Sequence, residues 1–412
     1  MNKLTGNAVI GQSGGPTVAI NATLSGVVRG CKESDCVKKV YGALYGIEGL
    51  LNEKFCDLTE LLKTEEDHRL LEQTPAAALG SCRKKMPKPD ADRATYEKLL
   101  EIFKKYDIRY FFYIGGNDSM DTVHKVSEFM NTQGYEMRVM GVPKTIDCDL
   151  AETDHTPGYG SAAKYIATTI KEILADTAVY TVKAVTIVEI MGRDAGWLTC
   201  AAALPKLTGE GPDLIYLPEV PFDYEEMYKD VFDAFKKHPN VVIAISEGAR
   251  LKDGTYVGEG TQSGAVDIFG HKYLSGTGKA LEMTIKNKFG CKVRSVELNL
   301  PQRCAAHLQS KTDIDESVAI GKYAASVAVN EGETGKMAAF VREPGEKYSV
   351  SFKTADIGKV ANAVRSLPRN FINARGNYVT DECIKYIEPL ILGESDVVYE
   401  CGLPKHFEIK KD

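Results

Sequence analysis

Short apolar runs alternate along the chain with glycine-rich or acidic turns and with segments of helical periodicity. This alternation constrains the fold more than any other feature. NAVIGQSGGP at 7–16 is followed by AINATLSGVVRG, and YFFYIGG at 110–116 is followed by SMDTVHKVSEFM. Further apolar runs lead into RVMGVPKTIDCD at 138–149, AVTIVEIMGRDAG at 184–196 and VVIAISEGA at 241–249. Strands that alternate with helices in this way predict an α/β fold with a parallel, doubly wound sheet.

The polar residues that could carry chemistry follow the predicted strands. Open α/β sheets bind ligands in the crevice at the carboxyl ends of their strands. Because 412 residues exceed the size of one typical domain, we expect two domains or one large α/β unit, with a site at these strand ends.

The composition excludes several classes of protein. A formal net charge of −6 argues against general nucleic-acid binding. The sequence contains no apolar stretch of about 18 residues and no basic-then-apolar leader, so we expect neither a membrane span nor a secretion signal. The ten cysteines contain no Cys-x-x-Cys pair, which favours reduced, packed thiols in a cytoplasmic protein over zinc ligands.

The turn GQSGGP, which begins at Gly11, has the composition of a phosphate-binding loop. Gly14 and Gly15 allow backbone N–H groups to approach an anion, and the following helix, which Pro16 can help to begin, adds a favourable dipole. A tight turn without a ligand is one alternative. A serine hydrolase is another, because Gly11-x-Ser13-x-Gly15 matches a nucleophile elbow in which Ser13 would be the nucleophile.

Two further turns offer positive charge and oxygen ligands. In GSCRKK at 80–85, Arg83 can form paired hydrogen bonds with phosphate oxygens, although a solvated basic turn is the alternative. In GGNDS at 115–119, Asn117 and Asp118 offer oxygens to Mg²⁺, which takes one or two protein ligands together with waters and substrate phosphates. A helix-capping role for these two residues is the alternative.

The segment PKTIDCD places Lys144, Thr145, Asp147 and Asp149 directly after a predicted strand. Asp147 and Asp149 alternate, so an extended segment could face both carboxylates toward one side. One carboxylate could accept a hydroxyl proton while the other binds a metal or forms a hydrogen bond. This segment is therefore the candidate catalytic loop.

Later strands are followed by three arginines and a carboxylate. Arg193, Arg294 and Arg303 could bind a phosphate. Glu247 could accept hydrogen bonds from sugar hydroxyls. Together with the earlier turns, these residues indicate a phosphorylated polyol that meets an anionic phosphoryl donor.

In this order, the motifs resemble those of the phosphofructokinase superfamily across residues 5–315. GQSGGPTVAIN resembles the family's phosphate loop, GSCR its donor-phosphate segment, GGNDS its metal loop and PKTIDCD its catalytic loop, while EIMGR, ISEG and PQR resemble its sugar-phosphate segments. The resemblance implies two Rossmann-like, doubly wound domains with the active site in the cleft between them. The expected divisions are a donor domain at 1–155, a sugar-phosphate domain at 156–300, and a C-terminal segment at 301–412 that returns to both domains and extends beyond them.

The resemblance also implies a glycolytic or gluconeogenic reaction, phosphoryl transfer to the 1-hydroxyl of fructose 6-phosphate, with Mg²⁺ as cofactor. Asp147 would accept the hydroxyl proton, assisted by Lys144, Thr145 and Asp118. The implied donor contacts are Gly14, Gly15, Arg83, Asp118 and Lys144. The implied sugar-phosphate contacts are Thr145, Ile146, Asp147, Met191, Gly192, Arg193, Glu247, Arg294 and Arg303. The implied metal ligands are Asn117 and Asp149.

Two positions distinguish the ATP-using members of this family from the diphosphate-using members. ATP users generally carry glycine after the metal-loop aspartate and before the catalytic Thr-Ile-Asp, whereas diphosphate users carry aspartate and lysine. Asp118 and Lys144 therefore favour diphosphate as the donor. A carboxylate about 4 Å from the inner phosphate of ATP would cost about 4 kcal/mol at an effective dielectric of about 20, which is roughly a thousandfold in affinity. The compact ammonium of Lys144 suits a compact donor.

Three residues depart from the family pattern: Asn117 replaces an aspartate, Cys148 an asparagine, and Leu300 a histidine or tyrosine. Two rival hypotheses remain within the family, an ATP-dependent enzyme in which Asp118 points away from the nucleotide and a non-catalytic regulatory subunit. Because family sites include residues of a neighbouring subunit, we expect a homodimer or homotetramer whose small-molecule partners are fructose 6-phosphate and diphosphate.

Overall fold

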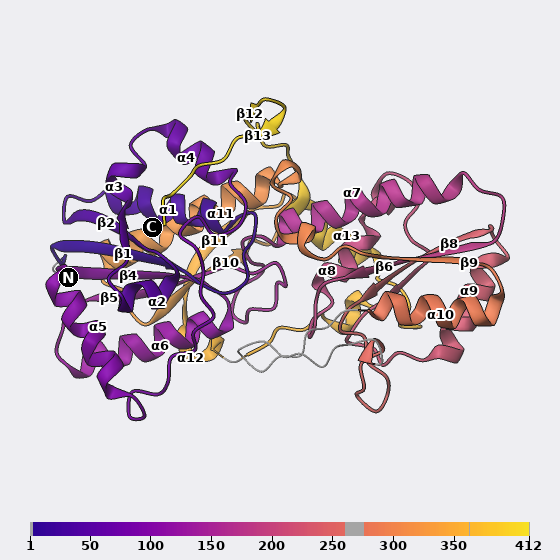
Figure 1. The fold of residues 1–412 in the computed structure, drawn as a ribbon, viewed down its shortest axis with the longest axis horizontal. Helices are drawn as coiled ribbons and strands as arrows, with labels where there is room; N and C mark the ends of the chain where they lie inside the picture. Colours follow the sequence, from indigo (N-terminus) through magenta and orange to yellow (C-terminus); the bar gives the residue numbers. More distant parts are fainter. Residues whose placement is uncertain (1–2, 260–275, 362, 412) are drawn as a thin grey trace.

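The computed structural model describes residues 3–259, 276–361 and 363–411, and these residues form two lobes, each built on its own sheet (Figure 1). The first sheet has seven strands in the order β11-β10-β5-β4-β1-β2-β3. Their bounds are β1 (Gly6–Gln12), β2 (Val37–Ala43), β3 (Phe55–Asp57), β4 (Ile108–Gly115), β5 (Arg138–Pro143), β10 (Lys336–Arg342) and β11 (Val350–Asp356). Five of these strands are parallel, and the edge strands β3 and β11 are antiparallel to their neighbours.

The second sheet has the order β7-β8-β6-β9, and all its strands are parallel. Its bounds are β6 (Ala184–Ile190), β7 (Leu214–Tyr216), β8 (Asn240–Ser246) and β9 (Lys292–Glu297). The exposed residues of β9 agree with its position at the sheet edge. The strand β8, in contrast, has six consecutive buried residues, as expected for a parallel strand covered on both faces.

Helices cover both faces of each sheet, which confirms the doubly wound α/β prediction. The longer helices are α1 (Ile20–Lys32), α5 (Arg93–Lys105), α6 (Asn117–Thr132), α7 (Tyr159–Ala178), α9 (Tyr224–Phe235), α10 (Thr277–Phe289) and α11 (Lys311–Ser326). In β1, Ala8 and Ile10 pack on the side of α1 and α11, whereas Val9 packs on the side of α5 and α6. Around the second sheet, α7 lies on one face and α9 and α10 on the other.

The remaining elements are short. They are α2 (Gly46–Leu51), α3 (Leu58–Leu61), α4 (Glu65–Glu72), α8 (Trp197–Cys200), α12 (Ile357–Val360), α13 (Asp381–Ile387), β12 (Tyr399–Glu400) and β13 (Leu403–Pro404), with several single-turn helices between them. Within the described residues, no helix combines the length and apolar character that crossing a bilayer requires.

The chain after residue 300 contributes to both lobes. The strands β10 and β11 complete the first sheet, and α13 packs its Cys383 and Ile387 into the core around Trp197. The helix α11 lies so close to α1 that a Cβ added to Gly26 would be 2.1 Å from the carbonyl oxygen of Val318. The division of the chain at residues 155 and 300 stays a prediction.

Candidate active site

The carboxyl ends of parallel strands from both sheets surround one cavity of about 500 Å³. Its lining comes from the segments that follow β1, β4, β5, β6 and β8, as expected for open α/β sheets. The volume suits a sugar phosphate and a small phosphoryl donor. Of the predicted site residues, the lining includes Gly14, Gly15, Arg83, Asn117, Asp118, Lys144, Thr145, Ile146, Asp147, Asp149, Met191, Arg193, Glu247 and Arg303.

The glycine turn after β1 leaves room for cationic side chains. Gly14 has φ +79°, and a Cβ added there would lie 3.3 Å from Lys144 Nζ. A Cβ added to Gly15 would lie 3.5 Å from Arg303 Nη1. Lys144 Nζ also donates a 2.7 Å hydrogen bond to the carbonyl oxygen of Gly15. The absence of side chains at these two positions therefore lets the cations reach the floor of the cavity.

Two details of this turn differ from what the sequence predicts, while an anion contact of the Gly15 N–H stays a prediction. The N–H groups of Ser13 and Gly14 donate to the carbonyl oxygens of Ile114 and Cys82, so they are already used inside the protein rather than presented to an anion. The helix does not begin near Pro16, because α1 starts at Ile20. The turn is therefore held by the neighbouring strand and by the segment that precedes Arg83.

The serine-hydrolase hypothesis for Ser13 lacks a histidine base. Ser13 is buried and lines the cavity, but no histidine is found among the described residues that line it. A serine nucleophile needs an adjacent general base to accept its proton.

Lys144 is buried among several other charged side chains. Burial, with smaller contributions from the nearby Arg303 and Arg83, lowers the pKa of Lys144 to about 8 against the opposing charges of Asp147 and Asp149. Lys144 is therefore mostly an ammonium ion at neutral pH and loses that charge under mildly alkaline conditions.

Asp147 and Asp149 both line the cavity, although the segment is not a continuous strand. Cys148 between them has φ +55° and is fully buried, so its backbone turns both carboxylates toward the cavity. Burial raises the pKa of Asp147, while the neighbouring Lys144 opposes this rise. Burial and the charge of Asp147 raise the pKa of Asp149 to about 7. Such shifts make carboxylates better proton acceptors near neutral pH.

Arg365 supports this loop from the C-terminal segment, where no chemistry was recognised in the sequence. Its backbone N–H donates a 2.8 Å hydrogen bond to the carbonyl oxygen of Asp149. Its guanidinium carbon lies 4.2 Å from the Trp197 ring centroid, and Trp197 Nε1 donates to the Arg365 carbonyl oxygen. No sequence signal identifies this contact, which joins residues more than 200 positions apart.

Asn117 and Asp118 form the first turn of α6, but they do not cap it. Gly116 is the N-cap residue, and no side chain caps the helix, so the capping alternative is wrong. Asp118 Oδ1 lies 3.5 Å from Lys85 Nζ, which brings the basic segment 83–85 next to the N-terminal end of α6.

The oxygen atoms on this wall suit a hard cation. Asn117 Oδ1 is buried and has no hydrogen-bond partner within the described residues. Asp149 places carboxylate oxygens in the lining of the same cavity. No group of three or more histidine, cysteine, aspartate or glutamate side chains with metal-binding geometry occurs in the part of the chain that the structure describes. A cation here would thus need oxygens from a bound substrate, which is typical of Mg²⁺.

Glu247 and Arg193 lie on the wall formed by the second sheet. Burial raises the pKa of Glu247 to about 8. The backbone N–H of Gly192 donates to Glu247 Oε1 at 3.2 Å, so Gly192 positions this carboxyl group although it does not line the cavity itself. A carboxyl group that is protonated at neutral pH can both donate and accept hydrogen bonds.

Arg294 is the one predicted site residue that the fold places elsewhere. It lies on the exposed edge strand β9 and lines a separate small hollow with Tyr180 and Lys292. Among the residues that line the main cavity without having been predicted to do so are Thr17, Asp194, Ala195 and Val364.

Comparisons with known proteins show which family this chain resembles. Residues 7–306 match the family model described as Phosphofructokinase. The chain is 41% identical to the pyrophosphate–fructose 6-phosphate 1-phosphotransferase of Halomonas elongata, over 98% of this chain and 96% of that protein. It is 39% identical to the protein of the same name from Xanthomonas campestris, over 98% and 96%. The crystal structure of a pyrophosphate-dependent phosphofructokinase from Nitrosospira multiformis superposes with a TM-score of 0.88 at 35% identity, covering 98% of this chain and 97% of that chain.

Proposed function

The chain belongs to the phosphofructokinase family, and we propose that it transfers a phosphoryl group from inorganic diphosphate to the 1-hydroxyl of D-fructose 6-phosphate. The products are fructose 1,6-bisphosphate and phosphate, and the reaction is reversible because no nucleotide anhydride drives it. The observation that carries the proposal is the presence of Asp118 and Lys144 on the wall of one cavity that also contains the glycine turn and the carboxylate pair.

Diphosphate binds on the side of the first sheet. Lys144 and Arg83 supply positive charge for its oxygens, and Gly14 and Gly15 leave space for it. Asp118 occupies the position where the inner phosphate of a nucleotide would come, and its charge repels that group. These roles are supported by the shared cavity and by the names of the relatives that the chain resembles over nearly its whole length.

Fructose 6-phosphate binds across the cavity. Arg193 and Arg303 hold the 6-phosphate, while Glu247, which is protonated at neutral pH, exchanges hydrogen bonds with the sugar hydroxyls. Asp147 accepts the proton of the 1-hydroxyl as that oxygen attacks the donor, and Thr145 orients Asp147 through its hydroxyl. Lys144 stabilises the charge that shifts onto the departing phosphate.

Asn117 and Asp149 would bind Mg²⁺ together with diphosphate oxygens, because the Asn117 amide oxygen is buried and unpaired within the described residues. The cation would reduce the charge repulsion between donor and acceptor. The protein's own contribution is to hold the oxygen atoms of Asn117 and Asp149 in the lining of the cavity.

An ATP-dependent phosphofructokinase is the competing function. A panel of phosphoryl donors with purified protein, fructose 6-phosphate and Mg²⁺ separates the two functions. Turnover with diphosphate and none with ATP is the expected result, and turnover with ATP alone would contradict it.

The exposed edge of the second sheet supports a homodimer or homotetramer. Arg294 on β9 faces away from its own cavity, and Val179, Tyr180 and Val182 nearby are largely exposed apolar residues. Light scattering of the purified protein checks the assembly, and a monomer at micromolar concentration would contradict it.

All ten cysteines are free, which fits a reducing, cytoplasmic compartment.

A further inference from the structure

The candidate catalytic loop is closed at its base by the segment to which it returns. The N–H of Thr145 donates to the carbonyl oxygen of Pro157 at 3.3 Å, and Thr156 Oγ1 donates to the carbonyl oxygen of Thr145 at 2.6 Å. The loop that carries Asp147 therefore leaves β5 and comes back beside its own start. Any contact that holds residues 153–157 also holds the base of the loop.

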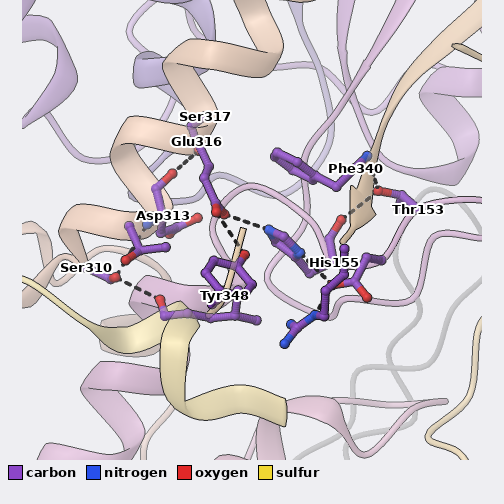
Figure 2. Close-up of polar contacts among 12 residues, drawn as sticks. Thr153, His155, Ser310, Asp313, Glu316, Ser317, Phe340 and Tyr348 are labelled. Atoms are coloured by element: carbon purple, nitrogen blue, oxygen red, sulfur yellow. Dashed lines mark hydrogen bonds and ion pairs between the residues drawn. The ribbon is translucent and has the colours of Figure 1, made fainter. Parts of the chain in front are cut away.

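His155 is the centre of such a contact (Figure 2). Its ring is buried, with Nδ1 2.9 Å from Asp154 Oδ1 and Nε2 2.8 Å from Glu316 Oε2. The ring also stacks on Phe340 of β10 at a centroid distance of 4.3 Å. A neutral imidazole carries only one N–H, so only the doubly protonated ring can donate to both carboxylates.

Further polar contacts fix the two carboxylates. Arg342 Nε donates to Asp154 Oδ1 at 3.1 Å, and Tyr348 Oη donates to Glu316 Oε1 at 2.8 Å. When His155 is protonated, the positive charges of His155 and Arg342 balance the negative charges of the two carboxylates that they contact. The titratable and charged groups around the ring are Asp154 on its own segment, Asp313 and Glu316 on α11, Arg342 on β10, Tyr348 before β11, and Tyr386 on α13.

Through α11, the contact between His155 and Glu316 connects two walls of the cavity. One turn before Glu316, Asp313 accepts hydrogen bonds from the N–H groups of Gly158 and Ser161 at the start of α7. The same helix packs closely on α1, which follows the glycine turn. The return of the catalytic loop and the donor-side helix are thus attached to one rigid element.

We propose, on the basis of the proposed function, that His155 is a positioning residue for phosphoryl transfer. As an imidazolium, it ties the return of the catalytic loop to α11 and so holds Asp147 in place. Burial opposes protonation of the ring, but the hydrogen bonds to Asp154 and Glu316 raise the pKa of His155 above its ordinary value. The contact is complete below that pKa and is lost as the pH rises through it.

The test compares His155→Gln with the wild type and with His68→Gln. His68 is a matched control because it is also buried and hydrogen-bonded, to Ser25 Oγ at 2.8 Å, but it lies outside the cavity. Burial lowers the pKa of His68 to about 4, so it does not change charge above pH 6. Both kcat and KM are measured from pH 6 to pH 9, and hydrogen exchange of peptides spanning 145–157 is followed by mass spectrometry.

The wild-type to His155→Gln ratio of kcat is expected to be about tenfold at pH 6 and to shrink toward alkaline pH. Contributions from Lys144 and Asp147 cancel in this ratio. Exchange in 145–157 becomes faster in His155→Gln but not in His68→Gln. A ratio near one, or one that does not change with pH, overturns the proposal. A purely structural role would lower thermal stability without this pH dependence.

A double variant tests the charge balance directly. Removing the imidazolium leaves two carboxylates beside one arginine, so Glu316→Gln in the His155→Gln background is expected to recover part of kcat and of the exchange protection. Strictly additive losses would contradict this. Absence of diphosphate-dependent turnover in the wild type contradicts the proposed function instead, and in that case the exchange measurements still decide whether His155 holds the loop.

Discussion

Lys144 Nζ lies 2.7 Å from the carbonyl oxygen of Gly15, and the space beside it exists because Gly14 has no side chain. The buried ammonium and the glycine turn are therefore one structural unit, built from the ends of β1 and β5. A phosphoryl donor placed in the cavity meets a cation that the protein has already positioned and partly desolvated.

Replacing Gly14 with alanine should weaken diphosphate binding. The left-handed backbone costs a non-glycine residue about 1–2 kcal/mol, and the new Cβ would lie 3.3 Å from Lys144 Nζ. Gly134→Ala is the matched control, because its φ of +66° carries the same backbone cost with nothing within 4 Å. We expect both variants to lose similar stability in urea denaturation, while only Gly14→Ala raises KM for diphosphate. Equal KM values in the two variants would contradict this.

Alkaline pH should reduce activity through Lys144. Because its pKa is lowered to about 8, the ammonium form predominates below that pH, and kcat/KM for diphosphate should fall as the pH rises through it. In Lys144→Arg the charge persists, so the alkaline decline should move to higher pH even if the absolute rate is lower. Lys164→Arg, at another largely buried lysine, should leave the decline near 8. An unchanged decline in Lys144→Arg would assign it to another group.

Replacing Asp147 with asparagine should remove the proton acceptor and keep the shape of the loop. We expect kcat to fall by about 10²–10⁴-fold, with little change in the affinity for fructose 6-phosphate. Asp194→Asn is the control, since Asp194 lines the same cavity but pairs with Arg250 at 2.6 Å. Turnover of Asp147→Asn close to that of the control would show that Asp147 is not the base.

Asn117→Asp should strengthen metal binding. A carboxylate in place of the unpaired amide oxygen is a better ligand for a hard cation, so half-saturation by Mg²⁺ should occur at lower concentration. Asn131→Asp introduces the same charge at an exposed position of the same helix and should have no such effect. Isothermal titration of Mg²⁺ in the presence of diphosphate makes the comparison, and identical curves would argue against Asn117 as a ligand.

Replacing Asp118 with glycine should admit ATP, because the repulsion between its carboxylate and the inner phosphate disappears. Lys85→Ala removes the partner of Asp118 while keeping the carboxylate, so it should not admit ATP. Steady-state rates with ATP decide between these outcomes. Failure of Asp118→Gly to use ATP would show that other groups exclude the nucleotide.

The residues at strand ends were predictable because parallel strands bring their carboxyl ends to one side of a sheet. Lys144, Asp147, Asn117 and Gly14 could therefore be assigned to one cavity before the fold was known. Local backbone details could not be predicted in this way. The Gly14 N–H donates to the carbonyl oxygen of Cys82, which lies in a turn more than 60 residues away along the chain.

Contacts made by the C-terminal part of the chain could not be predicted from the sequence either. Arg365 and Glu316 support the catalytic loop from positions more than 150 residues downstream of it. Neither residue belongs to a motif with a recognisable spacing, and His155 alone gives no sign of a second carboxylate. Arg294 is the opposite case. The sequence predicts it as a phosphate ligand, but it lies on the outer edge of the second sheet.

We infer that the charge of Asp118 restricts this cavity to a donor of two phosphates. Initial rates of purified wild-type protein with fructose 6-phosphate and Mg²⁺, compared for diphosphate and ATP under identical conditions, test it most directly. We expect kcat/KM for ATP to be lower than that for diphosphate by roughly a thousandfold or more. Equal or faster turnover with ATP would contradict it.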